Sequence, residues 1–588
     1  MSASNSRRRS PGRALNELAA QKASYGGDSA RSKLLLLRML QRSALARPGQ
    51  VVLLHEILVF LHAYPDDQYV YAQVRRMLEA FGRRADLRRH RKSLESSGIA
   101  GTDTVYPFAA STARWLAGRT GPSLTVEWNS GENTGALETR LPSLTLWAER
   151  SVFDEPPLEH RAWLDRLRGS ETDASFLVRR SAARTGTDLL GDQLYDELNL
   201  TLRIAAGPRA PDRTRARFSG RPLVLQRGLL RTGRPDLRVD MRVPPRGIRP
   251  VSGPRAVELI DLSREAMVTR ARDLYCFAAA DPADVRIADC GDGLEFACMG
   301  VRVEQRLLLD AVYGFLTLRN GVPIGYALFG TLWHSAEVAY NVFETFRGAE
   351  AAWIYGRLLA TVHAMFGVDT ITVDPYQLGH HNDEGLESGA WWFYYKLGFR
   401  PRDPAVSALA RREAERVRRR PGHRTGLPTL RGLVAANVFF SLGADRDDVM
   451  GSIETDAIAL GVSDMVARRF GSDREGATVA LADEAASALG VPDWRRLRGG
   501  PRLFWERWAP LVALLPVGNW TEAERFALRD IIIAKGGRRE SDYVTLFDAH
   551  PRLGAALASL ARGPGGSGAR QYCDLARRRL ASRRAVRR

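Results

Sequence analysis

The first part of the chain changes from an unpatterned start to apolar residues at helical spacing. Residues 1–30 are rich in Ser, Arg and Gly without hydrophobic periodicity, which predicts a disordered basic tail. The clearest helical series that follows is Val51, Leu54, Ile57, Leu58 and Leu61. Residues 31–249 are therefore expected to form a mainly helical region, which ends in an irregular connector rich in Pro, Gly and Arg.

Strand patterns and helix patterns alternate between residues 250 and 405. The dipeptide Asn320-Gly321 separates two strand-like runs and is typical of a tight hairpin. The expected strands are Tyr313–Arg319, Pro323–Trp333, Glu337–Thr345 and Asp369–Asp374. This alternation predicts an α/β domain in the middle of the chain.

Two helices are predicted within this domain. The first opens at Arg347–Ala352 and runs to about Phe366. The second covers Ala390–Leu397, with Ser388 as its N-cap candidate and Gly398 after its last turn. Helices on both faces of a sheet are the expected arrangement.

The chain becomes helical again after the middle domain. Residues 406–565 are expected to form a C-terminal helical region, and residues 566–588 a second basic tail. The whole pattern predicts a multidomain α+β protein with mainly helical flanking regions.

The formal net charge of +19 raises the possibility of nucleic-acid binding. Only five of the 86 basic residues are Lys, and eight Arg lie in residues 570–588. Much of the excess positive charge therefore reflects an Arg-rich composition and the tails. Such runs favour non-specific contact with polyanions.

The remaining composition excludes several other classes. No apolar stretch reaches the roughly 18 residues that a membrane helix needs. The amino terminus has no apolar segment after its charged residues, so a cytoplasmic protein is expected. The four cysteines, Cys276, Cys290, Cys298 and Cys573, form no CxxC pair, and His and Cys show no zinc-ligand spacing, so no metal is expected.

The predicted helix start at Arg347–Ala352 is the main candidate for binding chemistry. Gly348 and the alanines that follow let an anion approach the backbone closely, and the first N–H groups of a helix point at such an anion. Arg347 adds a positive charge. The glycine-rich signatures of nucleotide-binding loops do not occur in the sequence.

Two stretches in this order resemble the GNAT superfamily of acyl-CoA N-acyltransferases. FRGAEAAWIYGRLL is similar to that family's pyrophosphate-binding loop and helix, and WWFYYKLGFRP is similar to its closing motif. A strand lies between them, and the resemblance covers residues 250–405. It implies a mixed sheet that splays open to admit coenzyme A, and acetyl transfer from acetyl-CoA to a primary amine by direct attack.

The resemblance also implies roles for individual residues. Backbone groups of Val342 and Phe343 would pair with the pantetheine arm. The pyrophosphate would be held by Arg347, Gly348, Ala349, Glu350, Ala351 and Ala352. Glu350 stands where the family often has Gly, and a carboxylate there repels phosphate unless it points away.

Tyr394 stands where the family places a tyrosine that protonates the departing thiolate, and Tyr395 is the alternative one residue later. Direct attack by an amine also requires a base. Glu344 is the first candidate, followed by Glu337 and Asp374; the adjacent histidines His380 and His381 are further candidates.

Two other functions remain open from the sequence. The chain could be a CoA-binding or sensory module without activity, or a nucleic-acid-associated protein that uses its basic surface. The acceptor amine, the oligomeric state and the roles of the flanking regions also stay open.

Overall fold

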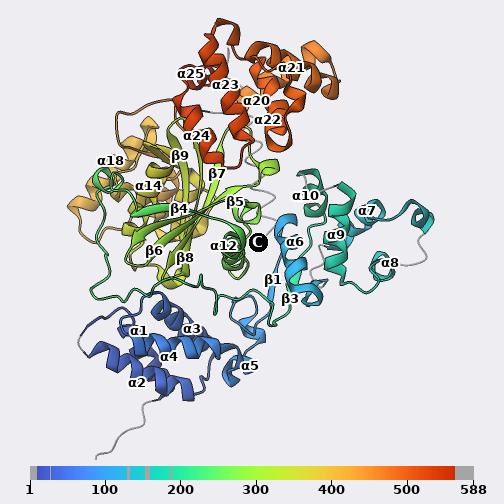
Figure 1. The fold of residues 1–588 in the computed structure, drawn as a ribbon. Helices are drawn as coiled ribbons and strands as arrows, with labels where there is room; N and C mark the ends of the chain where they lie inside the picture. Colours follow the sequence, from blue (N-terminus) through green and yellow to red (C-terminus); the bar gives the residue numbers. More distant parts are fainter. Residues whose placement is uncertain are drawn as a thin grey trace, which may run out of the picture.

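A nine-stranded mixed sheet forms the centre of the molecule (Figure 1). The computed structural model describes residues 10–26, 28–128, 133–152, 159–185, 189–453 and 455–562. The strands are β4 (Gly247–Val251), β5 (Ala280–Gly291), β6 (Leu294–Val301), β7 (Ala311–Arg319), β8 (Val322–Leu332), β9 (Ser335–Val342), β10 (Thr370–Val373), β11 (Arg400–Pro401) and β12 (Val438–Ser441), in the spatial order β11-β12-β10-β9-β8-β7-β6-β5-β4.

The predicted hairpin between β7 and β8 is confirmed. Asn320 and Gly321 have φ values of +50° and +78°, the left-handed pair that a two-residue turn between twisted strands requires. The prediction for β9 was too long, because the chain leaves the sheet after Val342. Residues Glu344–Phe346 form a short 3-10 helix, η7, instead of continuing the strand.

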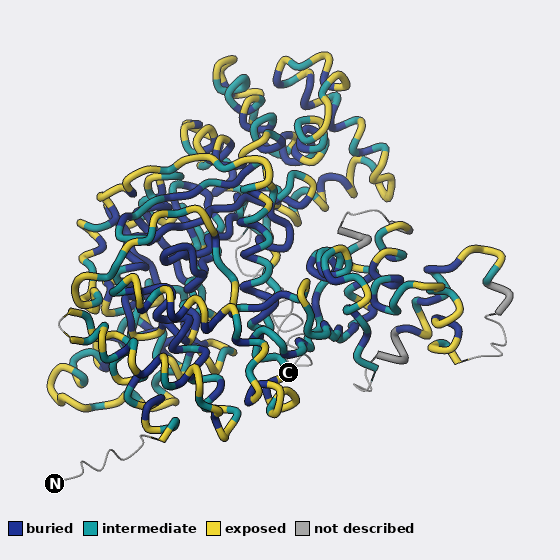
Figure 2. The backbone as a smooth tube through the Cα atoms, turned by 60° about the horizontal axis from the view of Figure 1, so that its bottom comes forward, coloured by how far each residue is buried: buried dark blue, intermediate teal, exposed yellow. Residues whose placement is uncertain are grey.

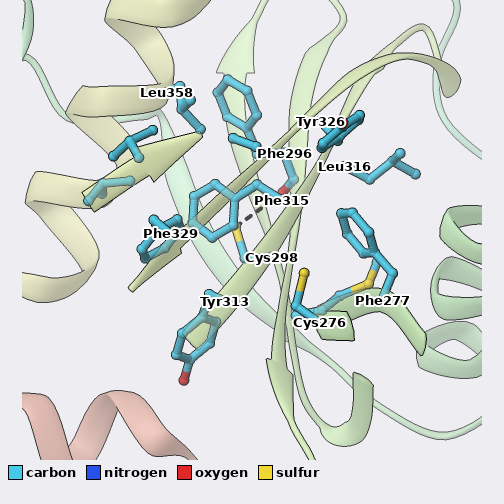
Figure 3. Close-up of a cluster of buried hydrophobic side chains, with 14 of the residues drawn as sticks. Cys276, Phe277, Phe296, Cys298, Tyr313, Phe315, Leu316, Tyr326, Phe329 and Leu358 are labelled. Atoms are coloured by element: carbon cyan, nitrogen blue, oxygen red, sulfur yellow. Dashed lines mark hydrogen bonds between the residues drawn. The ribbon is translucent and has the colours of Figure 1, made fainter. Parts of the chain in front are cut away.

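Helices cover both faces of the sheet. The first face is covered by α12 (Gly253–Val268) and α13 (Tyr275–Ala278), and the second by α14 (Ala351–Phe366). Figure 3 shows Leu358 of α14 on the same side as Phe329, whereas Phe277 of α13 lies on the side of Tyr326. Side chains of successive strand residues point to opposite faces, which explains this division. Below, these are called the α13 face and the α14 face.

Three short helices complete the central unit. They are α15 (Pro375–Leu378), α16 (Asp383–Ser388) and α17 (Ala390–Lys396). The N-cap of α17 is Gly389 and not Ser388, which is the last residue of α16. Gly389 has φ +69°, a conformation that glycine adopts without the steric cost of a side chain, and it reverses the chain between the two helices.

The amino-terminal helices pack against the β7–β8 end of the sheet. They are α1 (Pro11–Gln21), α2 (Ser29–Arg42), α3 (Pro48–Ala63), α4 (Gln68–Glu79) and α5 (Ala85–Arg89). The side-chain amide of Asn320 donates to the carbonyl of Ala63 at 2.9 Å, which fixes the hairpin to α3. Segment 1–30, expected to be disordered, contains α1, because Leu15 and Leu18 are fully buried in the core that it shares with α2 and α3.

A small second unit with its own core follows. It contains β1 (Thr104–Tyr106), α6 (Ala110–Thr120), β2 (Leu124–Val126), α7 (Asn133–Arg140), α8 (His160–Leu167), α9 (Asp173–Thr185), α10 (Leu189–Asp196) and β3 (Leu202–Ile204). Its three strands form a separate sheet in the order β1-β3-β2. The irregular connector after it contains the short helix α11 (Leu237–Asp240).

The carboxyl-terminal region is helical except for one strand. Its helices are α18 (Pro404–Arg419), α19 (Leu427–Leu433), α20 (Asp456–Phe470), α21 (Arg474–Leu489), α22 (Gly499–Val512), α23 (Glu522–Lys535), α24 (Glu540–Ala549) and α25 (Leu553–Arg562). The expected central domain of residues 250–405 lacks β12, which pairs with both β10 and β11 although it lies beyond residue 405.

A buried charged network joins these last helices to the sheet. Lys535 is fully buried, and its ammonium group donates to the carbonyl oxygens of Leu309 and Asp310 and to the carboxylate of Glu540 at 2.6 Å. Tyr313 of β7 accepts the N–H of Ser541 at 2.8 Å. The three hydrogen bonds compensate the charge of Lys535, as a buried ion requires. Figure 2 shows how burial concentrates in the sheet while outer helix surfaces stay exposed.

Within the described ranges, no helix is long and apolar enough to span a bilayer. Cys276, Cys290 and Cys298 are free thiols, and burial raises the pKa of each. Cys573, the basic segment 566–588 and Arg7–Arg9 lie outside the described residues.

Candidate functional site

Strands β9 and β10 are parallel neighbours, but they are paired along only part of their lengths. The register joins Ser335 to Thr370, and the last pair is Glu337 with Thr372. Residues 338–342 of β9 have no partner on this side among the described strands. The two strands therefore separate at their carboxyl ends, where this edge of β9 has no strand partner among the described residues.

Alternation of the backbone decides which β9 groups face this opening. The N–H of Phe343 donates to the carbonyl of Ile324 on β8 at 3.0 Å, so it points away from the opening. The preceding residue, Val342, directs its backbone to the other edge. Of the two residues predicted to pair with pantetheine, Val342 is accessible from the opening, whereas the Phe343 N–H already has a partner.

The amino terminus of α14 lies one short turn after β9 and carries no cap. Gly348 has φ +81°, and a side chain at this position would meet no atom within 4 Å. The first intrahelical bond runs from Ile354 to Glu350 at 2.9 Å, and no side chain caps the helix. The N–H groups of residues 351–353 therefore precede the helical ladder, which gives this end the partial positive charge that attracts anions.

Glu350, the departure from the family pattern, is turned into the protein. Its carboxylate is 2% exposed and lies 3.5 Å from the guanidinium of Arg319, which is equally buried. The other carboxylate oxygen accepts the N–H of Arg231 at 3.1 Å. Glu350 thus faces Arg319 and the backbone of Arg231, and its own carboxylate is not exposed beside Gly348.

Arg347 is exposed and forms an ion pair with a carboxylate of a neighbouring helix. Its guanidinium is paired with Glu384 of α16 and lies 3.4 Å from the carbonyl oxygen of Val342. Ala349 is buried, and Ala351 and Ala352 are half-buried. Of the residues predicted to hold an anion, Arg347 and Gly348 are exposed at the helix start, whereas Ala349 and Glu350 are buried.

Tyr394 belongs to a buried aromatic cluster on the α14 face. Its ring centroid lies 5.7 Å from that of Tyr355 on α14, which in turn lies 5.0 Å from that of Tyr340 on β9. Tyr340 belongs to the stretch of β9 without a partner on β10, so the cluster reaches the opening. Burial raises the pKa of Tyr394, and the hydroxyl group therefore stays protonated at physiological pH.

Tyr395 points in another direction. Its ring stacks on Trp391 with centroids 4.8 Å apart, and the guanidinium of Arg400 lies 4.0 Å from its centroid. Trp392 donates to the hydroxyl of Thr425 at 3.0 Å. The aromatic residues of this helix therefore face different ways, and Tyr394 is the tyrosine that packs on Tyr355 of α14.

The candidate bases are scattered. Glu344 is exposed on η7, and no contact joins it to Tyr394. Asp374 accepts the N–H of Tyr376 at 2.8 Å and so caps α15. Glu337 lies where β9 and β10 are still paired. His380 and His381 are exposed in one turn, with ring centroids 4.2 Å apart.

Polar residues that the sequence pattern did not indicate lie on the α13 face of the same opening. Arg270 lies over the ring of Phe343, 3.7 Å from its centroid, and Arg272 donates to the hydroxyl of Tyr326 at 2.8 Å. Asn341 of β9 has a buried side-chain oxygen without a hydrogen-bond partner. The signal in the sequence is an Arg-Ala-Arg triplet after a helix, which is too common in an Arg-rich chain to single out.

No cluster of His, Cys, Asp or Glu in the described ranges is arranged to hold a metal ion. Anion binding at the start of α14 and proton donation by Tyr394 are the chemistry that these residues can supply. Comparison of the chain with family models, with curated proteins and with solved structures finds no match.

Proposed function

We propose that the central domain is an acyl-CoA-dependent N-acyltransferase that transfers an acetyl group from acetyl-CoA to a primary amine. The observation that carries the proposal is the opening between β9 and β10 directly beside the uncapped start of α14. A thioester in the opening and a pyrophosphate at the helix start would be two parts of one continuous ligand.

Donor binding uses backbone groups more than side chains. The N–H groups at the start of α14 bind the pyrophosphate, helped by the dipole of a 16-residue helix and by Arg347. The N–H of Val342, whose carbonyl already accepts from Arg347, pairs with a carbonyl of the pantetheine arm in the manner of an added strand. The inward position of Glu350 removes the repulsion that its residue type suggests.

The reaction is a direct displacement at the thioester carbon. The amine nitrogen forms a bond to the carbonyl carbon, the bond from carbon to sulfur breaks, and the amine loses one proton to a base. The departing thiolate takes a proton from the hydroxyl of Tyr394, which solvent then restores. Glu344, which is exposed near the opening, is the first candidate for the base, acting through a water molecule.

Thermal unfolding with and without acetyl-CoA tests donor binding. At about 100 times its dissociation constant, acetyl-CoA should stabilise the wild type by about 2.7 kcal/mol. Gly348→Asp should abolish this effect, while Gly348→Asn, similar in size but uncharged, should keep part of it. Gly422→Asp is a matched control, because Gly422 also has positive φ and open space around it.

Release of free thiol from acetyl-CoA in the presence of a panel of amines tests turnover. An amine-dependent release that Gly348→Asp removes would support the transferase. Stabilisation by acetyl-CoA without any amine-dependent release would favour the alternative of a CoA-binding module. Equal stabilisation of the wild type and of Gly348→Asp would contradict the proposed phosphate position.

A further inference from the structure

Four arginines lie near the opening, and two of them, Arg270 and Arg272, contact residues on the α13 face of the sheet. Arg270 and Arg272 come from the turn after α12, and Arg213 and Arg347 complete the group. Ala271, between the first two, has φ +51°, which is a costly conformation for a residue with a side chain. The turn is therefore held in a shape that the surrounding structure imposes.

The four arginines contact only two carboxylates among the described residues. Arg213 is paired with Glu56 at 2.8 Å, while Arg272 and Arg347 both contact Glu384. Arg270 forms no ion pair with any residue that the structure describes. Its guanidinium donates to the carbonyl of Ala266 at 2.9 Å. The group thus has an excess of positive charge.

Arg270 shows the consequence of this crowding. Burial in the first place, and then the nearby positive charge of Arg213, lower the pKa of Arg270 to about 9, and Glu56 opposes the shift. A guanidinium that is desolvated and close to other cations is stabilised by an anion that hydrogen-bonds to it. This arrangement is typical of a site for a carboxylate or a phosphate.

Arg270 and Arg272 lie on the opposite face of the sheet from Tyr394, whereas Arg347 belongs to the proposed donor site. Arg270 contacts Phe343 and Arg272 contacts Tyr326, whose ring packs on Phe277 of α13. Tyr394, in contrast, packs with Tyr355 of α14. An anion bound by Arg270 and Arg272 therefore belongs to a molecule that approaches from the side away from the donor.

Asn341 connects the arginines with the opening. It lies directly opposite Tyr326 in the register of β8 and β9, so the two side chains share the α13 face. Its side-chain oxygen is buried and has no hydrogen-bond donor. Buried polar atoms are nearly always hydrogen-bonded, which indicates that a ligand or water donates here.

We propose that the acyl acceptor is an amine that also carries a carboxylate or a phosphate. Arg270 and Arg272 bind the anionic group, and the N–H of the amine is directed to the side-chain oxygen of Asn341, beside the open stretch of β9. This assignment of the acceptor rests on the proposed acyltransferase function. It names a substrate class and not a single compound.

Matched pairs of amines test the proposal through thiol release from acetyl-CoA. The pairs are O-phosphoethanolamine with ethanolamine, and β-alanine with its amide. For at least one pair, the anionic member should have a kcat/KM about tenfold higher or more, and Arg270→Gln/Arg272→Gln should lower that value by about 10–100-fold. The neutral member should change less than about threefold.

Two further variants separate charge from folding. Arg270→Lys keeps the charge and should retain part of the preference for the anionic amine, and Arg411→Gln, at an exposed position on α18, should change nothing. Asn341→Asp should lower kcat/KM for the anionic amine, because the new carboxylate repels its anionic group. Equal kcat/KM for both members of both pairs in the wild type would overturn the proposal.

A binding experiment is independent of turnover. Inorganic phosphate, added at constant ionic strength with saturating CoA, should stabilise the wild type but not Arg270→Gln/Arg272→Gln. If acetyl-CoA fails to bind while this phosphate effect persists, the acyltransferase function is wrong and the anion site stands. If the effect depends on Gly348 and not on Arg270 and Arg272, the anion is held at the helix start and the inference is wrong.

Discussion

The carboxylate of Glu350 and the guanidinium of Arg319 face each other at 3.5 Å beneath the start of α14, and both side chains are almost fully buried. Glu350 is the N-cap residue of the helix proposed to hold a pyrophosphate, yet its charge is directed into the protein. The ion pair therefore reconciles an acidic residue at this position with an anion on the outer side of the same turn.

Replacing Glu350 should affect stability much more than donor binding. Glu350→Gln leaves a buried guanidinium without its counter-charge and should lower the free energy of unfolding by about 3 kcal/mol. The dissociation constant of acetyl-CoA, measured by calorimetry, should change less than about threefold. A tenfold gain in affinity would instead mean that the carboxylate faces the phosphate. Arg319→Met with Glu350→Gln should cost less than the sum of the single changes.

Tyr394→Phe should reduce turnover without weakening the donor complex. It keeps the ring contacts with Tyr355 but removes the hydroxyl that is proposed to protonate the thiolate. We expect kcat to fall by about 10²–10⁴-fold with little change in acetyl-CoA affinity, because the lost interaction belongs to the transition state. Steady-state thiol release, or slow hydrolysis of acetyl-CoA without acceptor, provides the measurement.

Tyr395→Phe is the matched control for this change, since Tyr395 stacks on Trp391 and not on the β9 cluster. It should retain most of the activity. If both tyrosine variants turn over like the wild type, water or the bound amine supplies the proton.

His62 of α3 should make stability depend on pH. Burial lowers the pKa of His62 to about 3, whereas in the unfolded chain it is about 6.5. Below about pH 6.5 the unfolded state takes up a proton that the folded state does not, so stability is lost as the pH falls towards about 3. The loss between about pH 6.5 and about pH 5 should reach about 2 kcal/mol.

His62→Phe keeps a ring beside Tyr71 and should flatten this dependence. Chemical denaturation at about pH 7.5 and about pH 5 measures both proteins, and the slopes are compared because the absolute stabilities also contain packing effects. An unchanged slope would show that His62 is protonated in the folded protein.

Leu18→Ala tests whether α1 is part of the fold. Leu18 is fully buried, and truncation of such a side chain costs about 2–4 kcal/mol. Leu35→Ala on α2 is the control, because this leucine is 60% exposed and its loss should change stability by less than about 0.5 kcal/mol. If both variants unfold like the wild type, the segment is not docked, as expected from its composition alone.

Local sequence was sufficient for the elements whose stability is local. The Asn320-Gly321 turn was predictable because few residue pairs adopt two left-handed conformations in succession. The capping box of Thr521 and Glu524, which opens α23, is equally local. The different directions of Tyr394 and Tyr395 follow from the rotation of about 100° per residue of a helix.

Long-range contacts decided the rest. Val438–Ser441 is a four-residue apolar run that becomes a strand only because β10 and β11 offer it edges. Leu15 and Leu18 became part of the core because α2 and α3 lie over them. Elements this short gain their stability from tertiary packing, so their own propensity indicates little.

The candidate site divides in the same way. The sequence by itself determined that Gly348 precedes a helix and that Tyr394 lies on a different face of its own helix from Tyr395. Both features depend on near neighbours in the chain. The resemblance implied a sheet that opens, but only the tertiary structure decided that Glu350 turns to Arg319 and that Arg270, Arg272 and Asn341 meet on one face. The physical reason is that a charged side chain is oriented by the group with which it pairs, and these partners lie tens of residues away in sequence.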